Sequence, residues 1–314
     1  MQGFPRLEKH PTPDEISHLF NNNDPKIVWA EATDIVRRIS PGYDFILVQS
    51  VYEDVLLLFR GEYPGYGPVK TPYHDLYHTL EVLLCGLRLM HGVHVSGDHM
   101  ADDEITSVML ATLLHDVGYA QRRGEESGTG AQYTQTHVPR SVEFMRRYFT
   151  ERKPYPGLAD SLQDLISGTE DTQVFSRHGF SDDRIYMLGQ IVTTADLVGQ
   201  MADRNYLEKL LFLYLEFREA RFGNYQSMYD LLCKTKQFYE KVREKLDGPL
   251  GGIYKKLEFH FKDTMGVGNN YYLEAIEKNM AYLAKIIAHD EAELLTMLKR
   301  NGIAKRIQAL IAPV

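Results

Sequence analysis

The chain has 314 residues, of which 44% are hydrophobic and 25% are charged, and its formal net charge is -8. This composition is typical of a globular protein with a large core, and the acidic balance argues against nonspecific binding to nucleic acid or to membranes. The two cysteines cannot build a disulfide framework. No segment approaches the roughly 18 apolar residues of a transmembrane helix, and the start of the chain lacks a signal-peptide pattern. We therefore expect a cytoplasmic protein.

Apolar residues recur at three- and four-residue steps along most of the chain, which predicts an all-α fold. After a polar arm over residues 1–25, we expect helices over 27–39, 43–59, 74–90, 102–117, 142–149, 158–166, 181–201, 205–222, 227–246 and 271–299, and an amphipathic turn or two over 303–311. Breaks rich in glycine or proline fall at 61–72, 121–135 and 248–252. We divide the chain into an N-terminal helical extension packed on the core (1–60), a core bundle (61–246), and C-terminal helices that complete the same bundle (247–314).

An ionisable pair ends one strongly apolar run. Residues 108–114 read Val-Met-Leu-Ala-Thr-Leu-Leu, and His115-Asp116 follows them directly. Such a run belongs in the protein interior, where ionisable side chains are costly unless they pair with each other or bind a metal. The pair is therefore a candidate for chemistry.

Two other predicted helices carry side chains of the same type. His74 and His78 are four residues apart, so on the helix over 74–90 they would share one face. Asp196 stands among apolar residues, where a carboxylate needs a cationic partner or a metal. Imidazole nitrogens and carboxylate oxygens suit divalent ions such as Zn, Fe and Mn, so the three helices predict a metal site. The alternative is a set of buried histidines that pair with aspartate and bind no metal.

The order of these residues resembles the HD superfamily of metal-dependent phosphohydrolases, and more closely the catalytic domain of class I 3',5'-cyclic-nucleotide phosphodiesterases. Three motifs of the phosphodiesterases, Y-H-N-x-x-H-A-x-D-V, T-D-M and an E-F pair, correspond to Tyr73-His74-Asp75-Leu76-Tyr77-His78-Thr79-Leu80-Glu81-Val82, Thr169-Glu170-Asp171 and Leu215-Glu216-Phe217. The resemblance covers about residues 60 to 245.

The resemblance implies a metal-dependent phosphohydrolase that acts on a small, nucleotide-like phosphoester or phosphodiester. His78, His115, Asp116 and Asp196 would hold a first divalent ion (Mn, Mg, Fe or Zn), and Asp116 would bridge to a second. A hydroxide bridging the two ions would attack phosphorus, while His74 would protonate the leaving oxygen as the general acid.

The chain departs from the phosphodiesterase pattern at several positions. Tyr119 stands where those enzymes have a second histidine after the HD pair, Asp75 replaces their asparagine, and Glu81 replaces their aspartate. We expect Asp75 or Glu81 to orient a histidine from outside the ligand set. The glutamine and phenylalanine that clamp the purine have no clear match, although Gln237 and Phe238 lie in that region.

His137 follows the Gly-rich segment, where many HD phosphohydrolases have a histidine that serves the second metal or the phosphate. In that role Arg140 would contact the anion. Alternatively, His137 faces solvent at the start of a helix. The extra histidine also leaves open an HD-fold di-iron oxygenase, and the missing clamp leaves open a non-catalytic nucleotide-binding regulatory module. The apolar helices near 43–59 and 271–299 either cover the core or form the seam of a homodimer.

Overall fold

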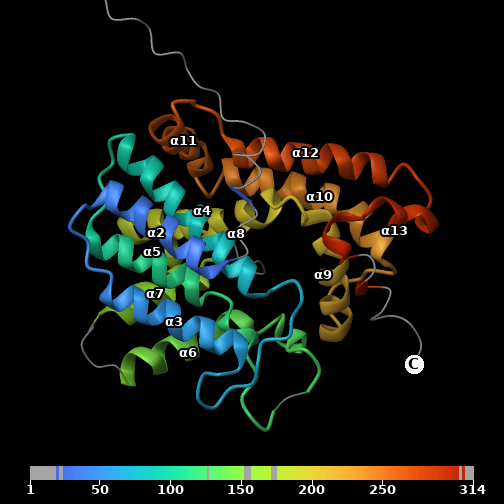
Figure 1. Cartoon of the computed structure of the whole chain (residues 1–314), viewed down its shortest axis with the longest axis horizontal. Coiled ribbons are helices and arrows are strands. Elements are labelled where there is room, and N and C mark those ends of the chain that lie inside the picture. Colours follow the sequence, from blue (N-terminus) through green and yellow to red (C-terminus); the bar gives the residue numbers. More distant parts are fainter. Residues whose placement is uncertain are drawn as a thin grey trace, which may run out of the picture.

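The structure is a computed structural model, and it describes residues 19–20, 24–125, 127–151, 157–170, 175–303 and 306–307. Within these ranges every regular element is a helix, and strand-like pairing is limited to one isolated bridge between Tyr66 and Arg122. The predicted all-α fold is confirmed as a compact bundle (Figure 1). Most of the predicted arm, most of the terminal amphipathic turn, and Asp171 lie outside the described residues.

The main helices follow the predicted order, with shifts of a few residues at most ends. They are α2 (Pro25–Ile39), α3 (Ile46–Arg60), α4 (Leu76–Val95), α5 (Asp102–Leu114), α6 (His137–Glu151), α7 (Leu158–Ser167), α8 (Asp183–Ala202), α9 (Tyr206–Ala220), α10 (Met228–Asp247), α11 (Leu257–Met265), α12 (Tyr271–Ile286) and α13 (Leu294–Met297). Two short 3-10 turns, η1 (Val117–Tyr119) and η2 (Ala131–Tyr133), precede α6.

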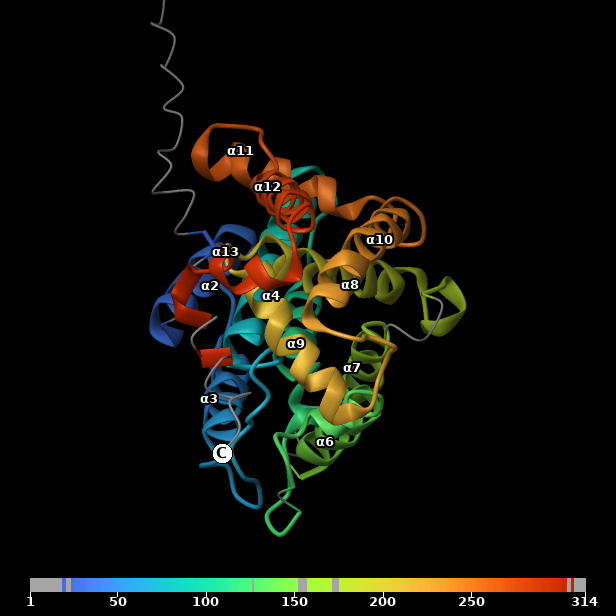
Figure 2. The same cartoon turned by 90° about the vertical axis from the view of Figure 1, so that its right-hand side faces the viewer.

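Helix α4 runs through the middle of the bundle. Its residues from Val82 to Val93 are all buried, so this helix is surrounded by protein on every side, as expected of a core helix. Helix α8 packs along it, and α2, α5 and α11 pack against its other sides (Figure 1 and Figure 2). The close approach of α11 requires Gly92, because a Cβ atom there would lie 2.0 Å from the carbonyl oxygen of Lys256.

Two helix ends near the predicted site differ from the prediction. Helix α4 starts at Leu76, and the Asp75 carboxylate accepts a hydrogen bond from the His78 backbone N–H at 3.0 Å. This cap starts the helix after His74, which therefore does not share a helical face with His78. Helix α5 ends at Leu114 instead of Val117, so that His115 and Asp116 lie at its C-terminal end.

The long helix expected over 271–299 is also interrupted. Helix α12 ends at Ile286, where the Tyr229 hydroxyl of α10 lies 2.9 Å from the Ile287 carbonyl and 3.0 Å from the His289 carbonyl. These contacts satisfy carbonyls that a helix end leaves without partners, and so they stabilise the turn.

Buried apolar side chains from α2 through α13 form one continuous cluster. Residues on both sides of the predicted boundaries at 60 and 246 contribute to it, and the division into three segments stays a prediction. None of the described helices has both the length and the apolar character needed to cross a membrane.

Candidate metal centre

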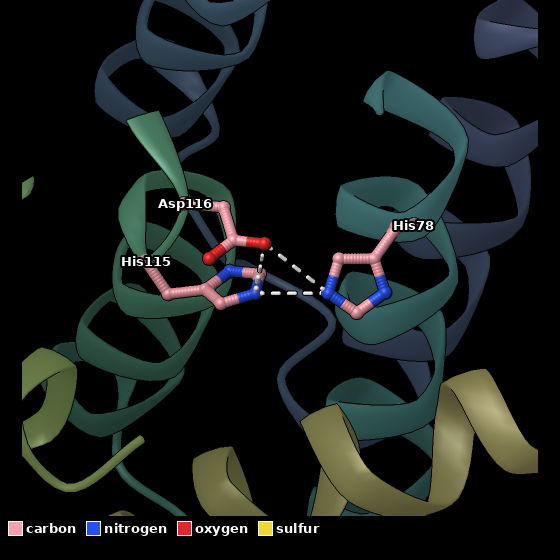
Figure 3. A group of neighbouring side chains, drawn as sticks. All are labelled: His78, His115 and Asp116. Atoms are coloured by element: carbon pink, nitrogen blue, oxygen red, sulfur yellow. Dashed lines mark hydrogen bonds and ion pairs between the residues drawn. The ribbon is translucent and has the colours of Figure 1, made fainter. Parts of the chain in front are cut away.

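Three predicted ligands bring their donor atoms together (Figure 3). His78 lies in the first turn of α4, and His115 and Asp116 follow the end of α5. Asp116 Oδ2 is 3.3 Å from Nε2 of His78 and 3.3 Å from Nε2 of His115, and the two nitrogens are 3.3 Å apart. All three side chains are buried. Among the described residues they form a group with metal-ligand geometry, with ligand atoms within 4.8 Å of one another.

Asp196 and His137 extend this cluster on two sides. Asp196 Oδ1, from α8, lies 3.2 Å from His78 Nε2 and 3.7 Å from His115 Nε2. His137, the first residue of α6, places its Nε2 atom 3.5 Å from Asp116 Oδ1. The four residues expected to hold the first ion, and the one expected to serve the second, are therefore neighbours in space.

Backbone carbonyls set the tautomers of two of the histidines. His115 Nδ1 is 2.9 Å from the Thr112 carbonyl oxygen, and His137 Nδ1 is 2.7 Å from the Thr134 carbonyl oxygen. Because a carbonyl only accepts, Nδ1–H donates, and each neutral ring presents a lone pair on Nε2 to the cluster. Asp116 Oδ2 is buried without a hydrogen-bond partner among the described residues. Imidazole lone pairs that meet beside an unpaired carboxylate oxygen form a set of donor atoms suited to a divalent cation.

Without a cation, the same groups must share protons. Burial alone would lower the pKa of His78, but the neighbouring carboxylates of Asp116 and Asp196 raise it to about 10. Burial would raise the pKa of Asp116, yet the neighbouring His115 and His78 hold it well below its ordinary value. Burial lowers the pKa of His137, which favours the neutral ring that a metal needs. A bound cation would take the place of the shared protons.

His74 lies beside the cluster and is oriented by a carboxylate from α9. Its Nδ1 atom is 2.6 Å from Oε2 of Glu216, whose side chain is 1% exposed. Oε1 of Glu216 accepts from the Tyr73 backbone N–H at 2.6 Å. Burial lowers the pKa of His74, but the charge and hydrogen bond of Glu216 raise it above its ordinary value. The sequence analysis missed this partner, although Glu216 belongs to one of the motifs compared with the phosphodiesterases.

Tyr119 packs against two of the histidine rings, whose own centroids are 6.2 Å apart. Its ring centroid lies 4.6 Å from that of His74 and 4.7 Å from that of His137, with interplanar angles of 16° in both pairs. Burial raises the pKa of its phenol well above the ordinary value, so the side chain stays neutral. At the position where the phosphodiesterases have a histidine, this protein has an aromatic ring that packs against both imidazoles.

A glycine brings His137 to the site. Gly118 of η1 packs against the first turn of α6 so closely that a Cβ atom would lie 2.0 Å from the carbonyl oxygen of His137. The Gly118 N–H donates to Ser141 Oγ at 2.9 Å. Arg140 then donates to the Gly118 and Ala120 carbonyls at 2.8 and 2.9 Å, and its guanidinium lies 3.6 Å from the Tyr133 ring centroid. The side chain predicted to contact phosphate instead fastens α6 to η1.

The two acids expected to orient a histidine have other partners. The carboxylate of Asp75 caps α4, and Glu81 Oε2 lies 3.3 Å from Lys209 Nζ. Neither is hydrogen-bonded to an imidazole ring among the described residues. The acid that contacts His74 is Glu216, which comes from α9.

A cleft of about 1120 Å³, including its open mouth, lies over the cluster. One end is lined by His74, His78, Asp116, His137 and Asp196. The other end is lined mainly by apolar and aromatic side chains from α9, from α10 and from the loop that joins them. We call the candidate metal ligands, His78, His115, Asp116, His137 and Asp196, the metal-ligand cluster. A ligand in the cleft can therefore touch this cluster and His74 at the same time.

A family model described as Npun_R2479-like matches residues 122–246. The chain is similar to that family over this segment, which contains His137, Asp196 and Glu216. His78, His115 and Asp116 precede it. No curated protein matches the chain.

Proposed function

We propose that this protein is a cytoplasmic metal-dependent phosphohydrolase that cleaves a phosphomonoester or phosphodiester. The observation that carries the proposal is the buried Oδ2 atom of Asp116, which has no hydrogen-bond partner in the described part of the chain and lies 3.3 Å from two imidazole nitrogens. His78, His115, Asp116 and Asp196 would hold one ion, and Asp116 together with His137 would serve a second. When bound, such ions acidify water and neutralise phosphoryl charge.

His74 supplies the proton in this proposal. It lines the same cleft as the cluster, and Glu216 engages its Nδ1 atom, which leaves Nε2 as the nitrogen available to a ligand. The raised pKa keeps a larger fraction of the ring protonated near neutral pH. The ring can then donate its Nε2 proton to the oxygen that leaves phosphorus, and the carboxylate of Glu216 stabilises the imidazolium before transfer.

One observation also favours a second candidate, a di-iron oxygenase. His137 adds a further neutral imidazole 3.5 Å from Asp116 Oδ1. Nitrogen and carboxylate ligands of this kind suit iron as well as zinc or manganese. The two candidates share the ligand set and differ in the reaction that the ions support.

The test is metal analysis of the purified protein, followed by assays with added Mn, Mg, Fe or Zn. Substrates are p-nitrophenyl phosphate and bis(p-nitrophenyl) phosphate, and oxygen uptake is recorded in parallel. We expect a bound transition metal and phosphoester hydrolysis that a chelator abolishes. A metal-free protein, or hydrolysis that chelators do not affect, would contradict the proposal. Iron with oxygen uptake and no phosphate release would favour the oxygenase.

A further inference from the structure

The end of the cleft away from the metal-ligand cluster is built from apolar side chains. We call this surface the apolar wall, and it consists of Leu210, Leu213, Phe217, Phe222, Tyr225 and Phe238. It comes from α9, from α10 and from the loop between them, on the side of the molecule that faces the viewer in Figure 2. Phe238 is 41% exposed, so its ring is accessible to a ligand in the cleft.

The wall is held together by aromatic packing around a tight turn. The Phe217 ring is stacked on Tyr225 at 5.5 Å between centroids and contacts Phe222 at 5.1 Å. Gly223, which lies between Phe222 and Tyr225 in the sequence, has a φ of +70°, and a Cβ atom there would lie 2.4 Å from the Tyr225 ring. Glycine is therefore needed for the turn that brings both loop aromatics onto α9. The surface is preformed, so a ligand does not have to order it.

The cleft offers little positive charge beyond the metal-ligand cluster and its histidines. Among the described residues that line it, the one lysine or arginine is Lys234. Lys234 Nζ already lies 2.7 Å from the Asp230 carboxylate and 2.6 Å from the Asn224 carbonyl oxygen. A chain of several phosphates would place its further charges against the apolar wall, at a large desolvation cost. The charge balance fits a ligand with one phosphoryl group.

Two polar side chains that line the cleft, Gln200 and Thr235, already have hydrogen-bond partners within the protein. Gln200 accepts from the Tyr73 hydroxyl, and its amide nitrogen donates to the Asp196 carbonyl at 3.1 Å. The Thr235 hydroxyl donates to the Leu231 carbonyl at 2.9 Å. Reading the edge of a nucleobase requires donors and acceptors at fixed positions, and these two side chains already use part of theirs within the protein.

From these features we propose that the substrate carries a single phosphoryl group on an apolar alkyl or aryl alcohol, and that the apolar wall binds its carbon skeleton. This inference rests on the proposed function for the phosphoryl end. In the reaction, water oxygen bonds to phosphorus, the bond from phosphorus to the alcohol oxygen breaks, and that oxygen takes the proton of His74. The products are inorganic phosphate and a free alcohol or phenol.

The test measures binding instead of turnover, with n-alkylphosphonates of two to six carbons, whose C–P bond is not hydrolysed. Isothermal titration calorimetry on the full-length, metal-supplemented protein gives Kd for each, with adenosine monophosphate and adenosine triphosphate as comparisons. We expect each added methylene to lower Kd about four-fold, equivalent to about 0.8 kcal/mol. A Kd independent of chain length, no binding of any phosphonate, or tighter binding of either nucleotide than of hexylphosphonate would overturn the inference.

Two exposed phenylalanines provide a matched pair of variants. Phe238 in the wall is 41% exposed, and Phe259 on α11, away from the cleft, is 42% exposed. We expect Phe238→Asp to raise Kd by a factor that grows with alkyl chain length, and Phe259→Asp to leave every Kd unchanged. Equal effects of the two substitutions would refute the role of the wall.

A parallel assay with p-nitrophenyl phosphate tests the proposed function separately. Hydrolysis without chain-length-dependent binding would leave the proposed function standing and refute the inference. Chain-length-dependent binding with no hydrolysis of any phosphoester would support the apolar wall and refute the phosphohydrolase.

Discussion

Replacing Glu216 with glutamine tests the role of His74 without touching a metal ligand. The substitution preserves size and keeps an oxygen that can accept from the Tyr73 N–H, but it removes the negative charge 2.6 Å from His74 Nδ1. That charge raises the pKa of His74 against the opposing effect of burial. Once it is removed, burial remains, and the pKa of His74 should fall below its ordinary value.

The size of the shift follows from the environment of the pair. Glu216 is 1% exposed and His74 is 17% exposed, so the hydrogen bond is poorly screened by solvent. Hydrogen bonds to charged groups contribute about 1.5–3 kcal/mol, which corresponds to about one to two pKa units. A general acid acts in its protonated form, so activity falls as pH rises through its pKa. We expect this fall to begin about one to two pH units lower in Glu216→Gln.

The assay is the pH dependence of kcat with p-nitrophenyl phosphate, together with metal content at each pH. At pH 8 the variant should be slower than wild type by about ten- to a hundred-fold, and below pH 6 the difference should shrink. Glu219→Gln is the matched control, because Glu219 lies on the same helix and hydrogen-bonds to Thr129 instead of a histidine. Superimposable pH profiles for Glu216→Gln and wild type would refute the reasoning. Loss of metal in Glu216→Gln would show instead that Glu216 helps to hold the metal ligands in position.

Three further predictions follow from single contacts. His74→Ala should lower kcat by about 10²–10⁴-fold while metal content stays the same, and loss of metal in this variant would identify His74 as a ligand. Gly118→Ala should destabilise the protein by about 1–3 kcal/mol in urea unfolding, because its Cβ atom would collide with a backbone oxygen at 2.0 Å. Gly42→Ala, with nothing within 4 Å, is the control and should change little. Burial lowers the pKa of both His260 and His91, whose Nδ1 atoms are 3.0 Å apart. As pH falls below about 6.5, these histidines take up protons in the unfolded chain before they do so in the folded protein, so the free energy of unfolding declines. We expect His260→Asn to reduce this decline, measured as the difference in thermal unfolding between about pH 5 and about pH 7.5. An equal decline in variant and wild type would contradict that reasoning.

Most of the predicted ligands could be recognised because they are ionisable residues in apolar, helix-forming stretches. That local signal pointed to His115, Asp116 and Asp196, whereas His78 came from its spacing from His74 and from the resemblance to the HD phosphohydrolases. The structure brings the donor atoms of all four within 3.2–3.7 Å of a neighbouring candidate ligand. Helix ends were less predictable. An apolar run does not show where hydrogen bonding stops, so the chain was expected to stay helical to Val117 instead of leaving α5 at Leu114.

Side chains whose role depends on a distant partner were assigned less well. Arg140 resembled an anion contact because it follows His137, but in the structure its guanidinium donates to the carbonyls of Gly118 and Ala120. Asp75 and Glu81 were chosen for their nearness in sequence to the histidines. Nothing local indicated which of them would meet an imidazole ring.

The sequence alone determined the helical class of this protein and the inward position of its candidate metal ligands, because apolar periodicity and the cost of buried charge act locally. Only the tertiary structure decided that Glu216, 142 residues further along the chain, orients His74. It also decided that Tyr119 packs against two imidazoles, and that aromatic side chains from α9 and α10 line the same cleft as the candidate metal ligands. The physical reason is that these contacts depend on how helices cross. The angles at which helices cross depend on side-chain packing over the whole bundle, and the apolar pattern of one helix describes only one of the packed surfaces.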